Sequence, residues 1–347
     1  NSGGIIMKTL WAMLAVLITA CVVIAQGTSL RLLADVRGIR IGAAIQPRRL
    51  TEADYAQTLS REFNLVTPEN DMKFGPIHPE QGTYNFTNAD AIVDFAVANR
   101  IQIKGHTLAW HSQQPAWVTN GSWTREQLMA VLHDHIMTVV GRYKGRIAYW
   151  DVVNEAIDDG QGNKPRETVW SRNIGPDYIE MAFRWAHEAD PGAKLLYNDY
   201  GTEGLSNKSN AAFALVQELV RKGVPIDGVG LQSHFVLANP PKIADIALNV
   251  ARLNALGLFV HFSELDIRIQ NPVSDEKLEQ QAELYKSITQ TCVAAAKCMG
   301  ITTWGFTDNY SWITSRYPGS GAALLFDNLY ASKPSYRAIA AALVRAP

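Results

Sequence analysis

Short runs of apolar and β-branched residues alternate along the chain with longer amphipathic stretches. Eight such runs are predicted to be strands, at residues 39–46, 65–69, 101–109, 147–154, 193–199, 228–234, 258–265 and 301–306. Apolar residues recur with helical spacing between them, as in 89–99, 125–140, 179–189, 207–222 and 276–296. Strands that alternate with helices are expected to pair in parallel, because a parallel connection needs a crossover.

The number and spacing of these units predict one α/β domain. The first predicted strand begins at residue 39 and the eighth at residue 301, a mean interval of about 37 residues. Eight such units match a (β/α)8 TIM barrel at its usual size. A doubly wound sheet would instead carry a glycine-rich phosphate turn after the first strand. That strand is followed by Gln46-Pro47-Arg48-Arg49, so we predict a single barrel over residues 27–347.

Residues 1–26 are predicted to be a secretory leader. Lys8 precedes an uncharged stretch, residues 9–30, whose apolar centre ends in small residues near Ala25. An uncleaved membrane anchor is one alternative, because the run approaches the length of about 20 residues that spans a bilayer. Lipid attachment at Cys21 is another. We expect a secreted, extracellular protein that has no membrane association after cleavage.

Composition narrows the possible functions without naming one. The chain has 32 basic and 33 acidic residues, and this near-zero net charge argues against a nucleic-acid partner. Three cysteines are too few for a disulfide-built miniprotein or a cysteine-rich zinc module. Cys292 and Cys298 remain after the leader, and an oxidising compartment favours a disulfide between them. Two buried thiols on one helix are the alternative.

Polar side chains gather where the predicted strands end, at the pole of a barrel that carries active sites. In chain order they are Glu69, Asn70, Lys73, His106, Trp110, His111, Asn154, Glu155, Asn198, Asp199, Tyr200, Gln232, His234, Glu264, Asp266, Trp304, Asp308 and Trp312. Glu155 and Glu264, on the fourth and seventh strands, can face each other across the pocket. Paired carboxyl groups in a neutral, aromatic-lined cleft suit acetal hydrolysis, and tryptophan rings suit the apolar faces of sugars.

Other chemistries lack their specific sequence marks. A metal site could use His106, His111, His234 or Glu264, but none of these residues belongs to an H-x-H pair, and no HExxH helix is present. The G-x-S-x-G elbow of serine hydrolases and the P-loop are also absent from the sequence. We therefore expect no metal and no organic cofactor.

Longer segments carry a resemblance to a known family. They are residues 67–73 (TPENDMK), 105–113 (GHTLAWHSQ), 150–155 (WDVVNE), 230–234 (GLQSH), 263–266 (SELD), 304–308 (WGFTD), 311–312 (SW) and 318–327 (PGSGAALLFD). Together they resemble glycoside hydrolase family 10, the endo-1,4-β-xylanases, over about residues 38–343. The resemblance implies retaining endo-hydrolysis of xylan and xylo-oligosaccharides. Retention requires two carboxyl groups about 5–5.5 Å apart.

The resemblance also implies a role for each matching residue. Glu155 matches the general acid/base and Glu264 the nucleophile, an assignment that the residues alone leave open. Asn154 matches the residue that bonds the sugar 2-hydroxyl, and His234 matches the one that orients the nucleophile. The expected substrate-binding residues are Glu69, Asn70, Lys73, His106, Trp110, Gln113, Tyr200, Gln232, Trp304 and Trp312. Asp266 is expected to be a supporting residue.

Three positions depart from the family pattern. Phe74 stands where Trp is common, Gly201 where Asn often follows Asp-Tyr, and Ile313 where Arg usually follows Ser-Trp. These departures bear on the outer subsites. The segment 292–298 resembles a disulfide pair of fungal members, so we expect a fungal-type enzyme, and a monomer. The alternatives are a related barrel β-1,4-glucanase and a non-catalytic carbohydrate-binding barrel.

Overall fold

The strands of the protein close into a barrel. The computed structural model describes residues 28–160 and 162–344. The barrel strands are β1 (Arg40–Ile45), β2 (Leu65–Pro68), β3 (Gln102–Ala109), β4 (Tyr149–Asn154), β5 (Lys194–Asp199), β6 (Gly228–Leu231), β8 (Phe259–Gln270) and β9 (Cys298–Thr303). Each pairs in parallel with the next in this order, and β9 pairs with β1. The predicted (β/α)8 barrel is confirmed.

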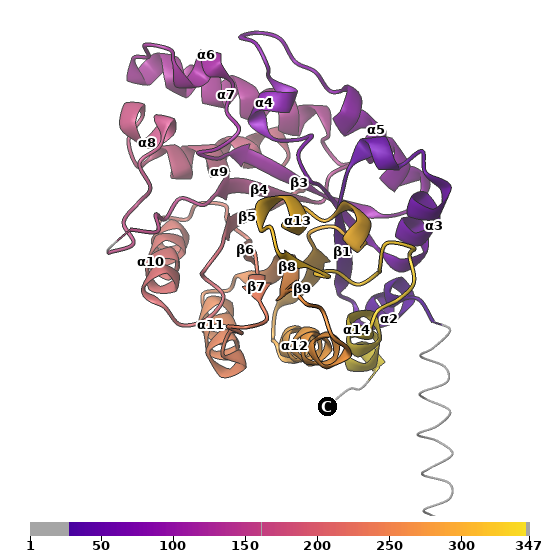
Figure 1. Ribbon diagram of the computed structural model, residues 1–347. Helices are drawn as coiled ribbons and strands as arrows, with labels where there is room; N and C mark the ends of the chain where they lie inside the picture. Colours follow the sequence, from indigo (N-terminus) through magenta and orange to yellow (C-terminus); the bar gives the residue numbers. More distant parts are fainter. Residues whose placement is uncertain (1–27, 161, 345–347) are drawn as a thin grey trace, which may run out of the picture.

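Helices surround the barrel (Figure 1), and apolar residues of these helices belong to its buried hydrophobic core. The longer ones are α2 (Leu30–Arg37), α3 (Ala53–Glu62), α5 (Thr87–Ala98), α7 (Arg125–Arg142), α9 (Tyr178–Ala189), α10 (Asn207–Arg221), α11 (Ile243–Ala255), α12 (Asp275–Ala294) and α14 (Pro334–Val344). The five helices predicted from periodicity are confirmed, with ends shifted by one or two residues. Local chemistry explains some of these ends: Thr124 and Gln127 form a capping box that starts α7.

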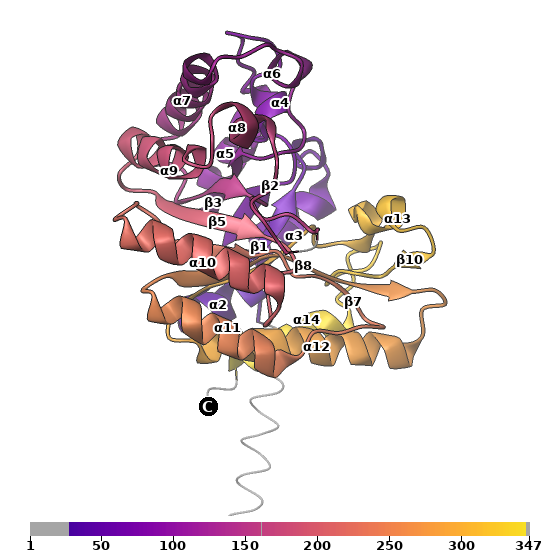
Figure 2. The ribbon, with the colours of Figure 1, turned by 90° about the vertical axis from the view of Figure 1, so that its left-hand side faces the viewer.

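Short helical turns lie in the connections between these elements. They are η1 (Pro47–Arg49), α4 (Phe74–Ile77), α6 (Ala116–Thr119), α8 (Val169–Asn173), η2 (Asp308–Tyr310) and α13 (Ile313–Arg316). Figure 2 shows the barrel from the side, with α13 at the end toward which the strand arrows point. The connections at that end carry many of the polar residues singled out in the sequence.

The sixth and seventh predicted strands have the wrong bounds. The run 228–234 is broken after Leu231, where Ser233 takes a left-handed φ of 67°, and a separate strand β7 (His234–Val236) follows. The seventh strand does not end at residue 265 but continues to Gln270. Beyond the barrel rim β8 pairs with β7 and with β10 (Ser320–Gly321), so the extension gains new hydrogen-bond partners (Figure 2). Apolar periodicity alone does not reveal such partners.

Close packing between strands explains why position 105 on β3 is a glycine. A Cβ atom at this position would lie 2.2 Å from the ring of Trp150 on the neighbouring β4, so any larger residue would clash. Trp150 is completely buried. A larger residue at position 105 would therefore disturb the packing between β3 and β4.

The predicted disulfide is present and joins two elements. Cys292, in the last turn of α12, is bonded to Cys298 at the start of β9. The alternative of two thiols on one helix is thereby excluded. Among the described residues, no helix is long and apolar enough to cross a membrane. The predicted leader, residues 1–26, lies outside the described residues.

Candidate active site

Glu155 and Glu264 lie at the same end of the barrel and are almost completely buried. Glu155 directly follows β4, and Glu264 lies in β8. Their exposed fractions are 8% and 4%. Asn198, at the end of β5, donates from Nδ2 to Glu264 Oε1 and to Asn154 Oδ1, both at 2.8 Å. A chain of amide hydrogen bonds thus connects the surroundings of the two carboxyl groups.

Glu264 is surrounded by hydrogen-bond donors. His234 Nε2 lies 3.2 Å from Glu264 Oε2, and the other ring nitrogen of His234 lies 2.9 Å from Asp266 Oδ2. Burial by itself raises the pKa of Glu264. The hydrogen bond with His234 and the charges of His106 and Lys104 outweigh burial and lower that pKa to about 2. Glu264 is therefore ionised at neutral pH.

Glu155 accepts two hydrogen bonds from side chains of other strands. Trp110 Nε1 donates to Oε2 at 2.8 Å, and Gln232 Nε2 donates to Oε1 at 2.9 Å. His111 Nδ1 lies 3.7 Å from the same Oε2. Each carboxyl oxygen of Glu155 thus has a partner supplied by a different barrel strand end, which fixes the direction of the group.

Buried charged residues support the centre from below. Lys104 and Asp151 are completely buried and form an ion pair of 2.6 Å between Nζ and Oδ2. His106 Nδ1 lies 2.9 Å from the same Asp151 oxygen. His106, expected to bind substrate, is therefore held in place by a buried carboxylate. Its ring also packs edge-on with that of Trp304, at 5.2 Å between the ring centroids.

A second group of predicted residues forms a chain on one side of the site. Glu69 accepts from Gln46 at 2.8 Å and from Asn70 at 3.3 Å. Lys73 Nζ donates to Asn70 Oδ1 at 2.9 Å and lies 4.9 Å from the centre of the Trp110 ring. Burial raises the pKa of Glu69. Burial also lowers the pKa of Lys73, and the nearby carboxylates of Glu264, Glu69 and Glu155 oppose this lowering. Lys73 thus links this chain electrostatically to the two glutamates.

Gln113 and the remaining tryptophans border the site. Gln113 is exposed, and its Nε2 donates to Asn70 Oδ1 at 3.4 Å. Trp312 donates from Nε1 to Asp266 Oδ2 at 2.8 Å, and its ring lies 5.0 Å from that of His234. Trp304 lies between His106 and His234. Asp266 therefore holds both His234 and Trp312, as expected for a supporting residue.

Tyr200 lies apart from this group. Its hydroxyl contacts Asp159 and Arg166, and its ring faces Lys208. Arg166 connects Tyr200 to the centre, because its Nε donates to the backbone carbonyl of Glu155 at 2.9 Å. The structure thus joins all the other residues that were expected to bind substrate into two neighbouring groups and places Tyr200 in a third.

The three departures from the family pattern have different surroundings. Phe74 is buried in an aromatic stack, 3.8 Å from the ring of His135, and so does not face a sugar site. Ile313 is completely buried in a small cluster with Leu324. Gly201 has a φ of 66°, and a Cβ there would touch the Lys208 side chain at 3.6 Å. Only Gly201 therefore adjoins the residues around Tyr200.

Asn198 is among the polar residues at the predicted strand ends, but the family resemblance gave it no role. Its place at the end of β5, close to Tyr200, was the signal for such a role. Ser263 donates to Asn198 Oδ1 at 2.6 Å, which orients the amide so that its nitrogen serves Glu264 and Asn154. Its role depends on the register between β5 and its neighbours, which composition does not display.

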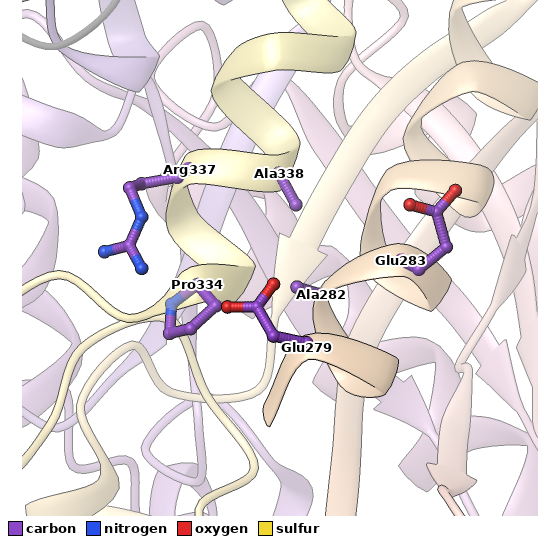
Figure 3. A pocket seen from close by; sticks show the side chains of 6 residues that line it. All are labelled: Glu279, Ala282, Glu283, Pro334, Arg337 and Ala338. Carbon is purple, nitrogen blue, oxygen red and sulfur yellow. The ribbon is translucent and has the colours of Figure 1, made fainter. Parts of the chain in front are cut away.

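One hollow away from this centre lies between α12 and α14, with Glu279 and Arg337 on different walls (Figure 3). None of the residues lining it belongs to the groups described above. In residues 28–160 and 162–344, no three His, Cys, Asp or Glu side chains form a group that could hold a metal ion.

Comparisons with known proteins agree with this geometry. The model of glycosyl hydrolase family 10 matches residues 29–342. Endo-1,4-β-xylanase B of Thermotoga neapolitana is 42% identical, covering 96% of this chain and 97% of the relative. Endo-1,4-β-xylanase D of Talaromyces funiculosus is 41% identical, covering 87% and 74%. Xylanase 10B of Thermotoga petrophila, crystallised with xylobiose, has a TM-score of 0.88 at 45% identity, covering 91% of this chain and 97% of that one.

These relatives come from bacteria and fungi alike, so the fungal-type assignment is not confirmed. The match to the family model extends over nearly all described residues, and the barrel agrees with a solved member at high identity. The chain belongs to glycosyl hydrolase family 10.

Proposed function

We propose that this protein is an endo-1,4-β-xylanase that hydrolyses xylan with retention of anomeric configuration, using Glu155 and Glu264. The observation that carries the proposal is the pair of buried carboxyl groups whose surroundings are joined through Asn198, with Glu264 held ionised by His234. An ionised carboxylate beside a second carboxyl group is what double displacement at an acetal requires.

In the first step, the Glu264 carboxylate attacks the anomeric carbon and forms a covalent glycosyl ester. The bond from that carbon to the glycosidic oxygen breaks, and Glu155 donates its proton to the departing oxygen. In the second step, Glu155 takes a proton from water, whose oxygen attacks the same carbon and releases Glu264. Two inversions at one carbon give net retention.

The neighbouring residues are assigned supporting roles in these steps. His234 keeps Glu264 ionised and oriented, and Asp266 keeps His234 in place. Asn154 lies beside Glu155 and is assigned to the 2-hydroxyl of the sugar, whose hydrogen bond strengthens in the transition state. Gln232 donates to Glu155 and belongs to the same wall of the site.

The polar chain of Glu69, Asn70, Lys73 and Gln113 is assigned to the hydroxyl groups of the sugars before the cleaved bond. Trp110, Trp304 and Trp312 supply apolar surface beside it, and His106 lies against Trp304. A Thermotoga petrophila relative was crystallised with xylobiose, which supports xylo-oligosaccharides as ligands of this chain. Tyr200 is assigned to the sugars after the cleaved bond.

The deciding experiment measures reducing-end release on xylan and on cellulose. We expect xylan to be cleaved and cellulose to remain intact, and the reverse would identify the alternative β-1,4-glucanase. Proton NMR of the first product should show the β-anomer, as retention requires. The variant Glu264→Ala should lose hydrolysis while still binding xylo-oligosaccharides. Near-normal turnover by that variant would remove Glu264 from the nucleophile role.

We propose further that the enzyme is secreted and acts as a monomer, with residues 1–26 as its leader and residues 27–347 as its catalytic domain. The disulfide between Cys292 and Cys298 supports secretion, because disulfides persist in oxidising compartments. Western blotting of culture medium against cell extract tests the localisation, and sedimentation tests the oligomeric state.

A further inference from the structure

Glu155 has an unusual backbone conformation. Its φ is 57°, in the left-handed region that non-glycine residues seldom adopt. Such a conformation is strained in a non-glycine residue and persists only where the surrounding structure holds it. The contacts that hold Glu155 therefore determine where its carboxyl group lies.

Two side chains outside β4 hold the backbone around Glu155. Arg166 donates from Nε to the Glu155 carbonyl at 2.9 Å and from Nη2 to the Ile157 carbonyl at 3.0 Å. On the other side, the amide of Ala156 donates to the Tyr197 hydroxyl at 3.2 Å. Arg166 and Tyr197 thus act as two arms that hold the turn carrying Glu155.

Each arm ends on a carboxylate. Arg166 Nη2 lies 3.3 Å from Asp159 Oδ2 and also donates to the Tyr200 hydroxyl at 3.2 Å. The Tyr197 hydroxyl donates to Asp199, which is completely buried. Burial raises the pKa of Asp199 to about 7, although Lys208 lowers it. Burial thus disfavours the charge on Asp199, and Lys208 favours it.

One cation serves both carboxylates. Lys208, in the first turn of α10, has its Nζ 2.8 Å from Asp159 Oδ1 and 3.2 Å from Asp199 Oδ1. The same atom lies 3.4 Å from the centre of the Tyr200 ring, and only 9% of the side chain is exposed. Lys208 thus joins the segment after β4, the end of β5 and the start of α10.

We propose that Lys208 is a positioning residue for Glu155, acting through Asp159 and Asp199 on the two arms that hold the strained turn. This inference rests on the proposed function of Glu155 as general acid. A loosened turn misplaces the proton donor, and small misplacements of a catalytic group are costly. The loss of activity on removing Lys208 should therefore depend on how much the leaving group of the substrate needs a proton.

The test compares two substrates for the variant Lys208→Met, which removes the charge and keeps an apolar stem against Tyr200. Xylotetraose has a sugar leaving group that needs protonation, whereas 2,4-dinitrophenyl β-xylobioside has an acidic phenol that does not. For both substrates kcat/KM reports the first displacement. We expect kcat/KM to fall roughly 10-fold or more on xylotetraose and less than about 3-fold on the aryl substrate.

A matched control comes from the other end of the same helix. Lys222 is a half-exposed lysine whose Nζ lies 3.2 Å from Glu180 Oε2, outside the site. Lys222→Met should leave both kcat/KM values within about 2-fold of the parent, because surface ion pairs contribute little. Lys208→Arg restores a cation and should recover part of the loss on xylotetraose.

A second variant guards against failure of Lys208→Met to fold. Asp159 has a half-exposed side chain, so Asp159→Asn should fold while removing one partner of Lys208. We expect the same selective loss on xylotetraose, with a smaller magnitude because the Asp199 contact remains. An equal loss on both substrates, or none, in the variants that fold would overturn the inference. If the parent protein cleaves neither substrate, the proposed function itself fails.

Discussion

At the scale of single residues, Glu264 shows that neighbours can reverse the effect of burial on a carboxyl group. Burial raises its pKa, but the hydrogen bond with His234 and nearby positive charges lower it to about 2. Burial likewise opposes the charge on His234, whose pKa is nevertheless raised well above 6.5 by Asp266 and Glu264. The nucleophile assignment therefore depends on three side chains brought together from β7 and β8.

Replacing His234 with Ala should move the acidic limb of the pH profile upward. The hydrogen bond with His234 is the largest effect that lowers the pKa of Glu264. Without it, burial raises this pKa, so Glu264 becomes protonated at higher pH. We also expect kcat/KM at neutral pH to fall about 10²-fold, as for loss of a donor to a buried catalytic charge. The measurement is kcat/KM for an aryl xylobioside between pH 3 and 8. His133→Ala, on the outer helix α7, is the control, and an unmoved acidic limb would contradict the prediction.

At the scale of elements, stacked rings pack α7 against α4, the short helix that begins directly after Lys73. His135, on α7, is completely buried and stacks on Phe74, with its ring also parallel to that of His78. Burial lowers the pKa of His135 well below 6.5 and that of His78 to a lesser degree. The folded protein therefore keeps the His135 ring neutral at pH values where the unfolded chain binds a proton.

This stack predicts a loss of stability on acidification. Above pH 6.5 both states are neutral at His135 and its contribution is complete. Below that pH the unfolded chain gains a proton that the folded state resists, so the free energy of unfolding falls by about 1 kcal/mol per pH unit. Thermal unfolding of the parent and of His135→Phe at pH 7 and pH 5.5 checks this. The variant should lose less stability between the two pH values, and an identical loss would disprove the assignment.

The disulfide between α12 and β9 predicts a different kind of stability change. Cys292 and Cys298 are six positions apart, and closing so short a loop constrains the unfolded chain by about 2 kcal/mol. The double variant Cys292→Ser with Cys298→Ser should therefore unfold several degrees lower in a thermal scan. Its kcat/KM on xylan at 25 °C should match that of the parent, because none of the site residues contacts this pair. A large loss of activity in the folded variant would count against the prediction.

At the scale of the whole molecule, the two ends of the described chain meet where the barrel closes. β1 pairs with β9, and α2 packs against α14 (Figure 1). Arg37, at the end of α2, donates from Nε to the Leu343 carbonyl at 2.6 Å and from Nη2 to the Val344 carbonyl at 2.9 Å. This side chain therefore ties the first described helix to the last.

Replacing Arg37 with Ala should destabilise this closure. Hydrogen bonds to a charged group contribute about 1.5–3 kcal/mol when well formed, and partial exposure reduces this to about 1 kcal/mol. We expect a lower midpoint in urea unfolding and unchanged kcat/KM, since the contact lies outside the site. Arg172→Ala, which removes an exposed and longer ion pair, is the control. Equal midpoints for the two variants would refute a role for Arg37 in closure.

The order of strands and helices, the closed barrel and the polar residues at its open end could all be inferred from the sequence. These features follow from periodicity and from the chirality of parallel connections, which act locally along the chain. The segments around Glu155 and Glu264 were equally readable, because their residues are contiguous. The disulfide partners were readable too, since only two cysteines lie outside the predicted leader.

Only the tertiary structure decided how these residues act on one another. The extension of β8, the bridge made by Asn198 and the pairing of Lys208 with two carboxylates depend on strand register and loop path. The same holds for the ionisation of Glu264, which is set by the balance of burial against neighbours from other strands. Periodicity specifies which face a residue occupies, whereas these interactions depend on distances between segments far apart in the chain.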